Sequence, residues 1–195
     1  MKQFLTSLIS WNVVSGMWGV FALYWMISAL RVKQTARTET SGARLATVAL
    51  LVAGAALIFE PTGPFGRLNG RFVPDREWIK GCGELLVAAG VTLAIWARWH
   101  IGQFWSARVT LKEDHRLIQS GPYARVRHPI YTGVLLAMMG TTLFVGVWRA
   151  LLGVLLVFVT HWLKARREEA LLTEQFGAEY QEYRERTGSL VRRLY

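Results

Sequence analysis

The stretch PIYTGVLLAMMGTTLFVGVW, residues 129–148, holds twenty residues without one charged side chain. A helix needs roughly 20 apolar residues to cross about 30 Å of hydrocarbon, so this stretch predicts a membrane-spanning helix. After Arg149 the sequence continues with ALLGVLLVFVTHWL, residues 150–163, which again lacks Lys, Arg, Asp and Glu. The connection between the two stretches is very short, and this predicts an antiparallel helical hairpin over 129–163.

Three further intervals of the sequence lack charged residues. They contain 28, 15 and 13 residues, and they end before Arg31, Glu60 and Arg98 respectively. The first is long enough to cross a bilayer, and the shorter ones need flanking Lys, Arg or Glu side chains that reach the membrane surface. We therefore expect an all-α integral membrane protein with about five transmembrane helices.

The region 1–97 is expected to hold three of these helices, at about 4–30, 44–60 and 81–97. An outer loop at 61–80 is rich in Gly and Pro, which favours irregular structure or only a short helix. Small residues four positions apart, Ser15 with Gly19 and Ala49 with Ala53, have the spacing that lets helices approach closely.

The overall composition agrees with a membrane protein and excludes other classes. Of the 195 residues, 52% are apolar, which excludes an intrinsically disordered chain. Cys82 is the single cysteine, so the chain has neither an intrachain disulfide nor a thiolate zinc site. Nine tryptophans are many for this length, and Trp favours membrane interfaces.

The basic residues decide between two kinds of anionic partner. The net charge of +10 is typical of proteins that bind nucleic acid or a membrane surface. Seventeen of the 23 Lys and Arg residues lie in 31–44, 98–128 and 164–195, which five spans bring to one side. The positive-inside rule makes that side cytoplasmic, with the N-terminus outside and the C-terminus inside. We expect a multi-pass protein of a prokaryotic inner or plasma membrane, with the lipid bilayer and neither nucleic acid nor metal as partner.

Two polar segments on the expected cytoplasmic side are rich in particular residue types. The first reads HRLIQSGPYARVRHPIY, residues 115–131. Pro129 suits the first turn of a helix and pushes the preceding residue out of the helical region, so His128 should lie just outside the helix and Tyr131 in its first turn. A helix N-terminus offers free N–H groups that suit a carboxylate or phosphate.

The second segment, KARREEALLTEQFGAEYQEY at 164–183, continues directly from the hairpin. We expect one cytoplasmic amphipathic helix over 164–186, lying beside His128 and Tyr131. The His-Pro pair could be a simple helix cap, and Glu168 and Glu169 could form a solvated face. Because the hairpin brings the two segments together, a polar pocket with cationic, aromatic and acidic groups is the interpretation we favour.

The motifs GPYARVRHPIYTG and REEALLTEQFGAEYQEY closely resemble the isoprenylcysteine carboxyl methyltransferase family, whose wider superfamily includes phospholipid N-methyltransferases. The resemblance covers about residues 100–190. It implies a membrane-embedded enzyme that uses S-adenosylmethionine, with 98–195 as the catalytic, cofactor-binding region. By position in the family motifs, the implied cofactor contacts are His115, Arg116, Leu117, Ile118, Tyr123, His128, Pro129, Ile130, Tyr131 and Glu168.

The resemblance also bears on the methyl acceptor, which it implies to be a lipid-like acid such as a prenylcysteine. The family has a basic residue four positions before the first glutamate. Lys164 stands there in place of the usual Arg, and Lys cannot make the same bidentate fork. Lys164 and Arg167 are therefore the expected substrate-binding residues, and Arg127 and His128 are candidates for orienting the reactants.

Three other readings remain open from the sequence. The chain could methylate an amine of a phospholipid, for which His161 or a nearby Glu would be the base. It could belong to membrane reductases that share a related C-terminal pattern and bind a nicotinamide cofactor. It could also be a non-enzymatic membrane protein that keeps the scaffold.

Overall fold

The computed structural model describes residues 2–30, 35–38, 41–60, 63–105, 110–112 and 117–191. Six α-helices dominate these residues: α1 (Lys2–Ala29), α2 (Ser41–Phe59), α3 (Glu77–Ile101), α4 (Pro129–Val145), α5 (Trp148–Phe176) and α6 (Ala178–Arg186). Three short 3-10 helices accompany them: η1 (Gly66–Asn69), η2 (Gly102–Phe104) and η3 (Gly121–Ala124). One small antiparallel ribbon pairs β1 (Thr35–Thr38) with β2 (Thr110–Lys112), so the fold is helical apart from this addition to the expected all-α class.

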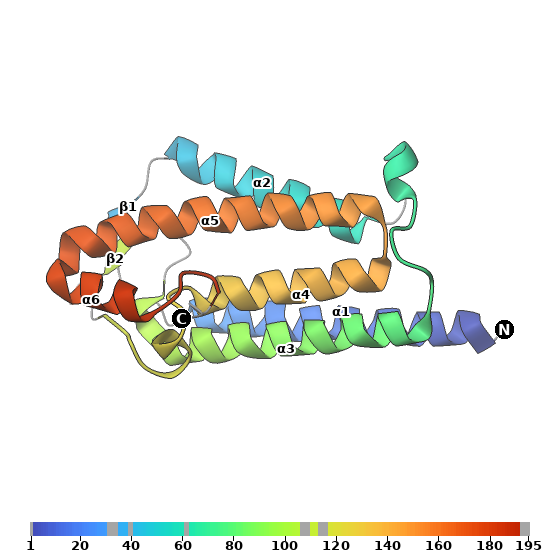
Figure 1. Ribbon diagram of the computed structural model, residues 1–195, viewed down its shortest axis with the longest axis horizontal. Coiled ribbons are helices and arrows are strands. Elements are labelled where there is room, and N and C mark those ends of the chain that lie inside the picture. Colours follow the sequence, from blue (N-terminus) through green and yellow to red (C-terminus); the bar gives the residue numbers. More distant parts are fainter. Residues whose placement is uncertain are drawn as a thin grey trace.

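The five long helices run along the length of the molecule, with α3, α4 and α5 side by side (Figure 1). The closest packing joins α3 to α4, where glycines let two backbones touch. A Cβ atom at Gly90 would lie 2.4 Å from the Ala137 nitrogen, and one at Gly140 would lie 2.6 Å from the Gly83 oxygen. Glycine is therefore required along this contact, because any larger residue would push the helices apart.

A second glycine contact joins α2 to α5, where a Cβ at Gly153 would lie 2.6 Å from the Gly54 oxygen. The expected pairs of small residues are not where the helices pack closely. A Cβ atom added at Gly19 would have no neighbouring atom within 4 Å, and Ala49 and Ala53 are exposed. The spacing of small residues alone could not tell which helix face meets another helix.

The hairpin between α4 and α5 turns at Gly146, whose φ of +73° is left-handed and favours glycine. The Gly146 carbonyl accepts a hydrogen bond from Phe72 N–H at 2.9 Å, which ties the preceding loop to the turn. Next to the turn, the buried Arg149 side chain donates to Asn69 Oδ1 and to the carbonyls of Leu57 and Ile58. This arginine caps the last turn of α2 and holds three segments together at this end of the bundle.

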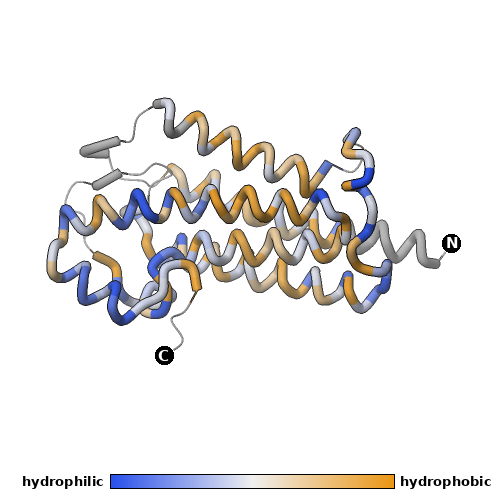
Figure 2. Tube along the Cα trace, turned by 45° about the horizontal axis from the view of Figure 1, so that its top comes forward, coloured by the Kyte–Doolittle hydropathy of each residue, from blue (hydrophilic) through white to orange (hydrophobic). Residues whose placement is uncertain are grey.

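Apolar residues form a band around the middle of the bundle, and polar residues collect at its two ends (Figure 2). Among the described residues, α1, α3 and α5 each contain a stretch long and apolar enough to cross a membrane. The apolar helices α2 and α4 are shorter, since the 17 residues of α4 extend only about 26 Å. The protein is an integral membrane protein with a helical fold.

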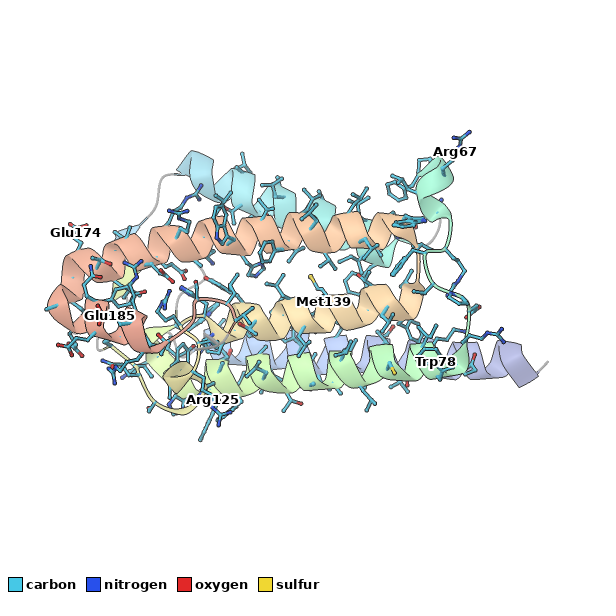
Figure 3. All side chains as sticks on the ribbon, in the orientation of Figure 1. Arg67, Trp78, Arg125, Met139, Glu174 and Glu185 are labelled. Atoms are coloured by element: carbon cyan, nitrogen blue, oxygen red, sulfur yellow. The ribbon has the colours of Figure 1, made fainter. Side chains whose placement is uncertain are left out.

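Exposed tryptophans border the apolar band, as is typical of membrane interfaces. Trp78 and Trp148 lie near the end that carries η1, and they are 70% and 51% exposed. Trp99 and Trp162 lie toward the opposite end, and they are 69% and 42% exposed. Figure 3 shows Arg67 and Trp78 at the first end, with Arg125, Glu174 and Glu185 at the other.

Helix boundaries differ most from the expected ones in two places. The third helix begins at Glu77, before the expected 81, and continues to Ile101. The expected single helix over 164–186 is divided: α5 runs without interruption from the hairpin to Phe176, and α6 starts at Ala178. The cause is Gly177, whose φ of +51° and ψ of −121° end one helix and redirect the chain into the next.

Candidate active site

The segment before α4 is fixed by buried contacts at the end of the bundle opposite η1. Gly121 has a φ of +60° and lies so close to the His100 ring that a Cβ would clash with it. Tyr123 is buried, its hydroxyl donates to the Ala97 carbonyl at 3.4 Å, and its own carbonyl accepts from Tyr183 at 2.6 Å. Burial raises the pKa of Tyr123, so its hydroxyl stays protonated.

The N-terminus of α4 has the form that the His-Pro pair predicts. His128 lies just outside the helix with a φ of −123°, and Pro129 occupies the first helical position. The His128 side chain makes no capping hydrogen bond, and it is directed to the acidic residues of α5 instead. Tyr131 follows in the first turn, so both aromatic rings leave the chain at the same end of the bundle.

A polar cluster, called the Tyr131 cluster below, surrounds the Tyr131 ring and includes His128, His161, Lys164 and Glu168. The Tyr131 hydroxyl donates to Glu168 Oε1 at 2.7 Å. The His128 imidazole stacks on the Tyr131 ring, with ring centroids 5.4 Å apart and planes inclined by 4°. The His161 ring meets it edge-on at 4.8 Å, and Lys164 Nζ lies 5.5 Å from its centroid. An aromatic ring that attracts one cation is suited to hold a cationic ligand as well.

Glu169 joins the cluster to two other segments. Its Oε1 accepts hydrogen bonds from Arg127 Nε at 3.0 Å and from Ser189 Oγ at 2.9 Å. The same oxygen lies 3.1 Å from His128 Nε2. Arg184 Nε of α6 lies 3.8 Å from the second carboxylate oxygen. Such charge-assisted contacts are stronger than neutral hydrogen bonds, particularly where the side chains are largely buried.

His128 is held between two carboxylates. Its Nδ1 lies 3.5 Å from Glu168 Oε2, while its Nε2 faces Glu169. Burial alone would lower the pKa of His128, but the contacts with Glu168 and Glu169 outweigh burial and raise it above its ordinary value. A neutral imidazole carries only one N–H, so protonation lets both ring nitrogens donate.

A short C-terminal strap, residues 187–191, lies along the segment that leads into α4. Arg127 N–H donates to the Gly188 carbonyl at 2.9 Å, and His128 N–H donates to the Ser189 carbonyl at 3.1 Å. Arg127 Nη1 also reaches the Thr187 carbonyl at 2.6 Å. Leu190 is buried against Leu135 and Val157. The strap therefore covers one side of the cluster and packs into the space between α4 and α5.

The remaining residues singled out from the sequence have different surroundings. Ile118 and Ile130 pack with Tyr123 in an apolar cluster, and Leu117 is half-buried in the loop beside it. Arg167 is exposed on α5. The expected contacts at 115 and 116, His115 and Arg116, lie outside the described residues. Within the parts of the chain that the structure describes, no group of His, Cys, Asp and Glu side chains could hold a metal ion.

Sequence reasoning missed Glu169 and Ser189 as members of this cluster. Glu169 was recognised only as part of an acidic pair that a solvated helix face could equally explain. Its pairing with Arg127, three residues after Ala124 of η3, follows from the hairpin. Its contact with Ser189 depends on where the strap lies, and no local pattern in the tail predicts that position.

Comparison with known proteins places the chain in a family. The family model described as "Phospholipid methyltransferase" matches residues 78–179, which is more than half of the chain. The chain belongs to the phospholipid methyltransferase family. The match covers α3 except its first residue and all of α4 and α5. It thus includes His128, Tyr131, His161, Lys164, Glu168 and Glu169, but not Ser189 of the strap.

Members of the isoprenylcysteine group are among its relatives, as the motifs indicated. The protein-S-isoprenylcysteine O-methyltransferase of Schizosaccharomyces pombe is 36% identical over 91 residues, which are 45% of this chain and 39% of that protein. The solved structure of a eukaryotic intramembrane Ras methyltransferase, an isoprenylcysteine carboxyl methyltransferase, superimposes with a TM-score of 0.57 at 21% identity. The superposition covers 80% of this chain and 54% of the methyltransferase chain, and this likeness shows a shared fold. The chain thus matches about half or less of the length of each of these relatives.

Proposed function

We propose that this protein is an S-adenosylmethionine-dependent membrane methyltransferase that transfers a methyl group to the carboxylate of a prenylcysteine or a similar lipid-like acid. The observation that carries the proposal is the contact of Tyr131 with Glu168 beside His128 and Lys164. The family match supports methyl transfer over the reductase reading.

The chemical groups of this cluster fit the proposed cofactor, which carries a carboxylate, an ammonium, ribose hydroxyls and a sulfonium. Glu168 has a carboxylate that can pair with the ammonium or accept from a hydroxyl. The Tyr131 ring can attract a cationic group through its face. The N-terminus of α4 at Pro129, next to His128, suits a carboxylate.

The methyl group of bound S-adenosylmethionine is already activated by the positive sulfur. A carboxylate acceptor is nucleophilic without loss of a proton, so this chain needs no general base for that reaction. Its residues contribute by aligning the reactants and by keeping water out. Lys164, which lies over Tyr131, is positioned to hold the acceptor carboxylate, with the exposed Arg167 one turn further along α5.

The proposed orientation puts this cluster on the cytoplasmic side. It rests on the basic segments 98–128 and 164–195, which flank the cluster in sequence and follow the positive-inside rule. In this orientation α1 starts outside, and each of the five long helices crosses the bilayer. A water-soluble cofactor would then reach the site from the cytoplasm, and a lipid-like acceptor would reach it from the bilayer.

The test is a methylation reaction with the purified full chain in lipid, methyl-labelled S-adenosylmethionine and a farnesylated cysteine analogue. The proposal predicts label in a base-labile methyl ester of the analogue. The absence of such an ester, with the protein folded and the cofactor bound, would contradict the assignment of the acceptor.

N-methylation of an aminophospholipid is the second candidate, and the family match and His161 both support it. His161 Nδ1 lies 2.9 Å from the Val157 carbonyl, which can only accept, so Nδ1 carries the proton and Nε2 is the basic nitrogen. An amine must lose a proton before or during transfer, and such a base would serve that step. Phosphatidylethanolamine in the same assay would yield a base-stable N-methyl product if this candidate is right.

A further inference from the structure

The two adjacent glutamates of α5 contact different parts of the molecule. Glu168 accepts from the Tyr131 hydroxyl and faces His128 Nδ1. Glu169 faces the other ring nitrogen, and it also accepts from Arg127 and Ser189. His128 faces both carboxylates, so it physically links the two sets of contacts.

We propose that Glu169 is a positioning residue, which fastens the C-terminal strap and His128 to α5 and thereby fixes the Tyr131–Glu168 pair that binds the ligand. The inference rests on the proposed function for the identity of that ligand. Glu169 itself does not touch the reacting atoms in this scheme, because its Oε1 already meets three protein donors, from Arg127, His128 and Ser189, and its Oε2 faces Arg184.

Glu169 fixes the orientation of the His128 ring. The ring could rotate if only one nitrogen were held, but contacts on both sides fix its plane. In that plane the ring stacks on Tyr131 with an inclination of 4° and keeps Nδ1 toward Glu168. Removing Glu169 frees the Nε2 side, so the stack and the Glu168 contact lose one of their two supports.

Glu169 also anchors the strap. Ser189 Oγ donates directly to Glu169, and Arg127 joins Glu169 to the Thr187 carbonyl. The Gly188 amide donates to the Arg125 carbonyl at 3.3 Å, and this bond is one of the backbone hydrogen bonds that join the strap to the segment before α4. A weaker anchor at Glu169 should therefore open the strap and expose the Gly188 amide to exchange with solvent.

The experiment compares Glu169→Ala and Glu169→Gln with wild type, using the full chain in lipid nanodiscs. Glu182→Gln on the exposed side of α6 is the matched control. Hydrogen exchange of the Gly188 amide reports on the strap and needs no ligand. Titration with S-adenosylhomocysteine reports on the site, and the KM of the farnesylated cysteine analogue reports on the acceptor.

For Glu169→Ala we expect at least tenfold faster Gly188 exchange, a Kd for S-adenosylhomocysteine raised about tenfold or more, and an unchanged acceptor KM. Glu169→Gln keeps the shape and one accepting oxygen, so it should restore part of both losses. Glu182→Gln should match wild type. If Glu169→Ala does not fold, the Gln variant and Ser189→Ala provide the same two readouts.

Two results would overturn the inference. One is exchange and affinity within twofold of wild type in both Glu169 variants. The other is faster Gly188 exchange with unchanged affinity, because Glu169 would then be only an anchor for the strap. Failure of wild type to bind S-adenosylhomocysteine would instead contradict the proposed function, and the exchange data would still decide whether Glu169 holds the strap.

Discussion

His128 shows at the scale of one residue how sequence and structure contribute differently. The sequence predicted its place just before α4, because Pro129 restricts the preceding residue. The sequence could not predict that both ring nitrogens would face carboxylates. Those contacts come from α5, about forty positions further along the chain. The grouping of His128 with Tyr131 and Glu168 could be expected from the hairpin, whereas the contact to Ser189 required the fold.

The raised pKa of His128 predicts how stability depends on pH. Below the ordinary value of 6.5 the ring is protonated in both the folded and the unfolded chain, and its contribution to stability is complete. As pH rises above 6.5 the unfolded chain loses this proton first, so stability falls until the folded pKa is passed. Thermal unfolding in detergent from pH 6 to 9 should show this decline in wild type. His128→Asn should be less stable at pH 6 and show a shallower decline, and parallel curves would refute the assignment.

Tyr131→Phe tests a single hydrogen bond of the site. The variant keeps the ring that stacks on His128 but removes the hydroxyl that donates to Glu168. A buried hydrogen bond to a charged group contributes about 1.5–3 kcal/mol, so we expect weaker binding of S-adenosylhomocysteine by about tenfold or more. Surface plasmon resonance with captured protein measures this change. Wild-type affinity in the Phe variant would show that the hydroxyl does not orient Glu168 for the ligand.

At the scale of helices, the charge-free intervals located all five long helices, because the spacing of charges is a local property. The pairing of those helices was not accessible in the same way. Ser15 with Gly19 had a suitable spacing, yet the close contacts lie at glycines such as Gly90 and Gly153. The break at Gly177 was missed because apolar residues recur every four positions across it, at Leu172, Phe176 and Tyr180. The glycine itself was a possible signal.

Gly90→Ala tests the contact between α3 and α4. The added Cβ would meet backbone atoms of α4 at 2.4 and 2.5 Å, so the helices must separate. We expect a loss of about 1–3 kcal/mol in the free energy of unfolding, measured by SDS titration in mixed micelles. Gly19→Ala is the control, since nothing lies within 4 Å of its Cβ and Ala favours a helix. Equal stability of the two variants would contradict the packing described.

At the scale of the whole molecule, the polar residues at the two ends of the apolar band have distinct roles. One end is tied together by Arg149 and the loop before α3, and the other carries the Tyr131 cluster and the strap. Composition and charge placement predicted a membrane protein and an orientation. The family comparison adds membership of the phospholipid methyltransferase family, and both methyl transfer and the lipid-like acceptor are proposals that neither composition nor fold alone determines.

The proposed orientation can be tested with two cysteine positions in a Cys82→Ser background. Arg67→Cys lies on η1 at one end of the bundle, and Glu185→Cys lies on α6 at the other (Figure 3). In intact cells a membrane-impermeant maleimide should label position 67 readily. Position 185 should be labelled only after the membrane is permeabilised. The reverse pattern would invert the orientation, and labelling of both in intact cells would contradict five crossings.

The central claim is that the cluster around Tyr131 and Glu168 binds S-adenosylmethionine. Its most direct test is isothermal titration of S-adenosylhomocysteine into the full chain in lipid, with wild type, Glu168→Gln and the control Glu182→Gln measured together. The account predicts saturable binding to wild type and to Glu182→Gln, and a Kd raised about tenfold or more in a folded Glu168→Gln variant. Equal affinity in all three proteins, or no binding to wild type, would contradict it.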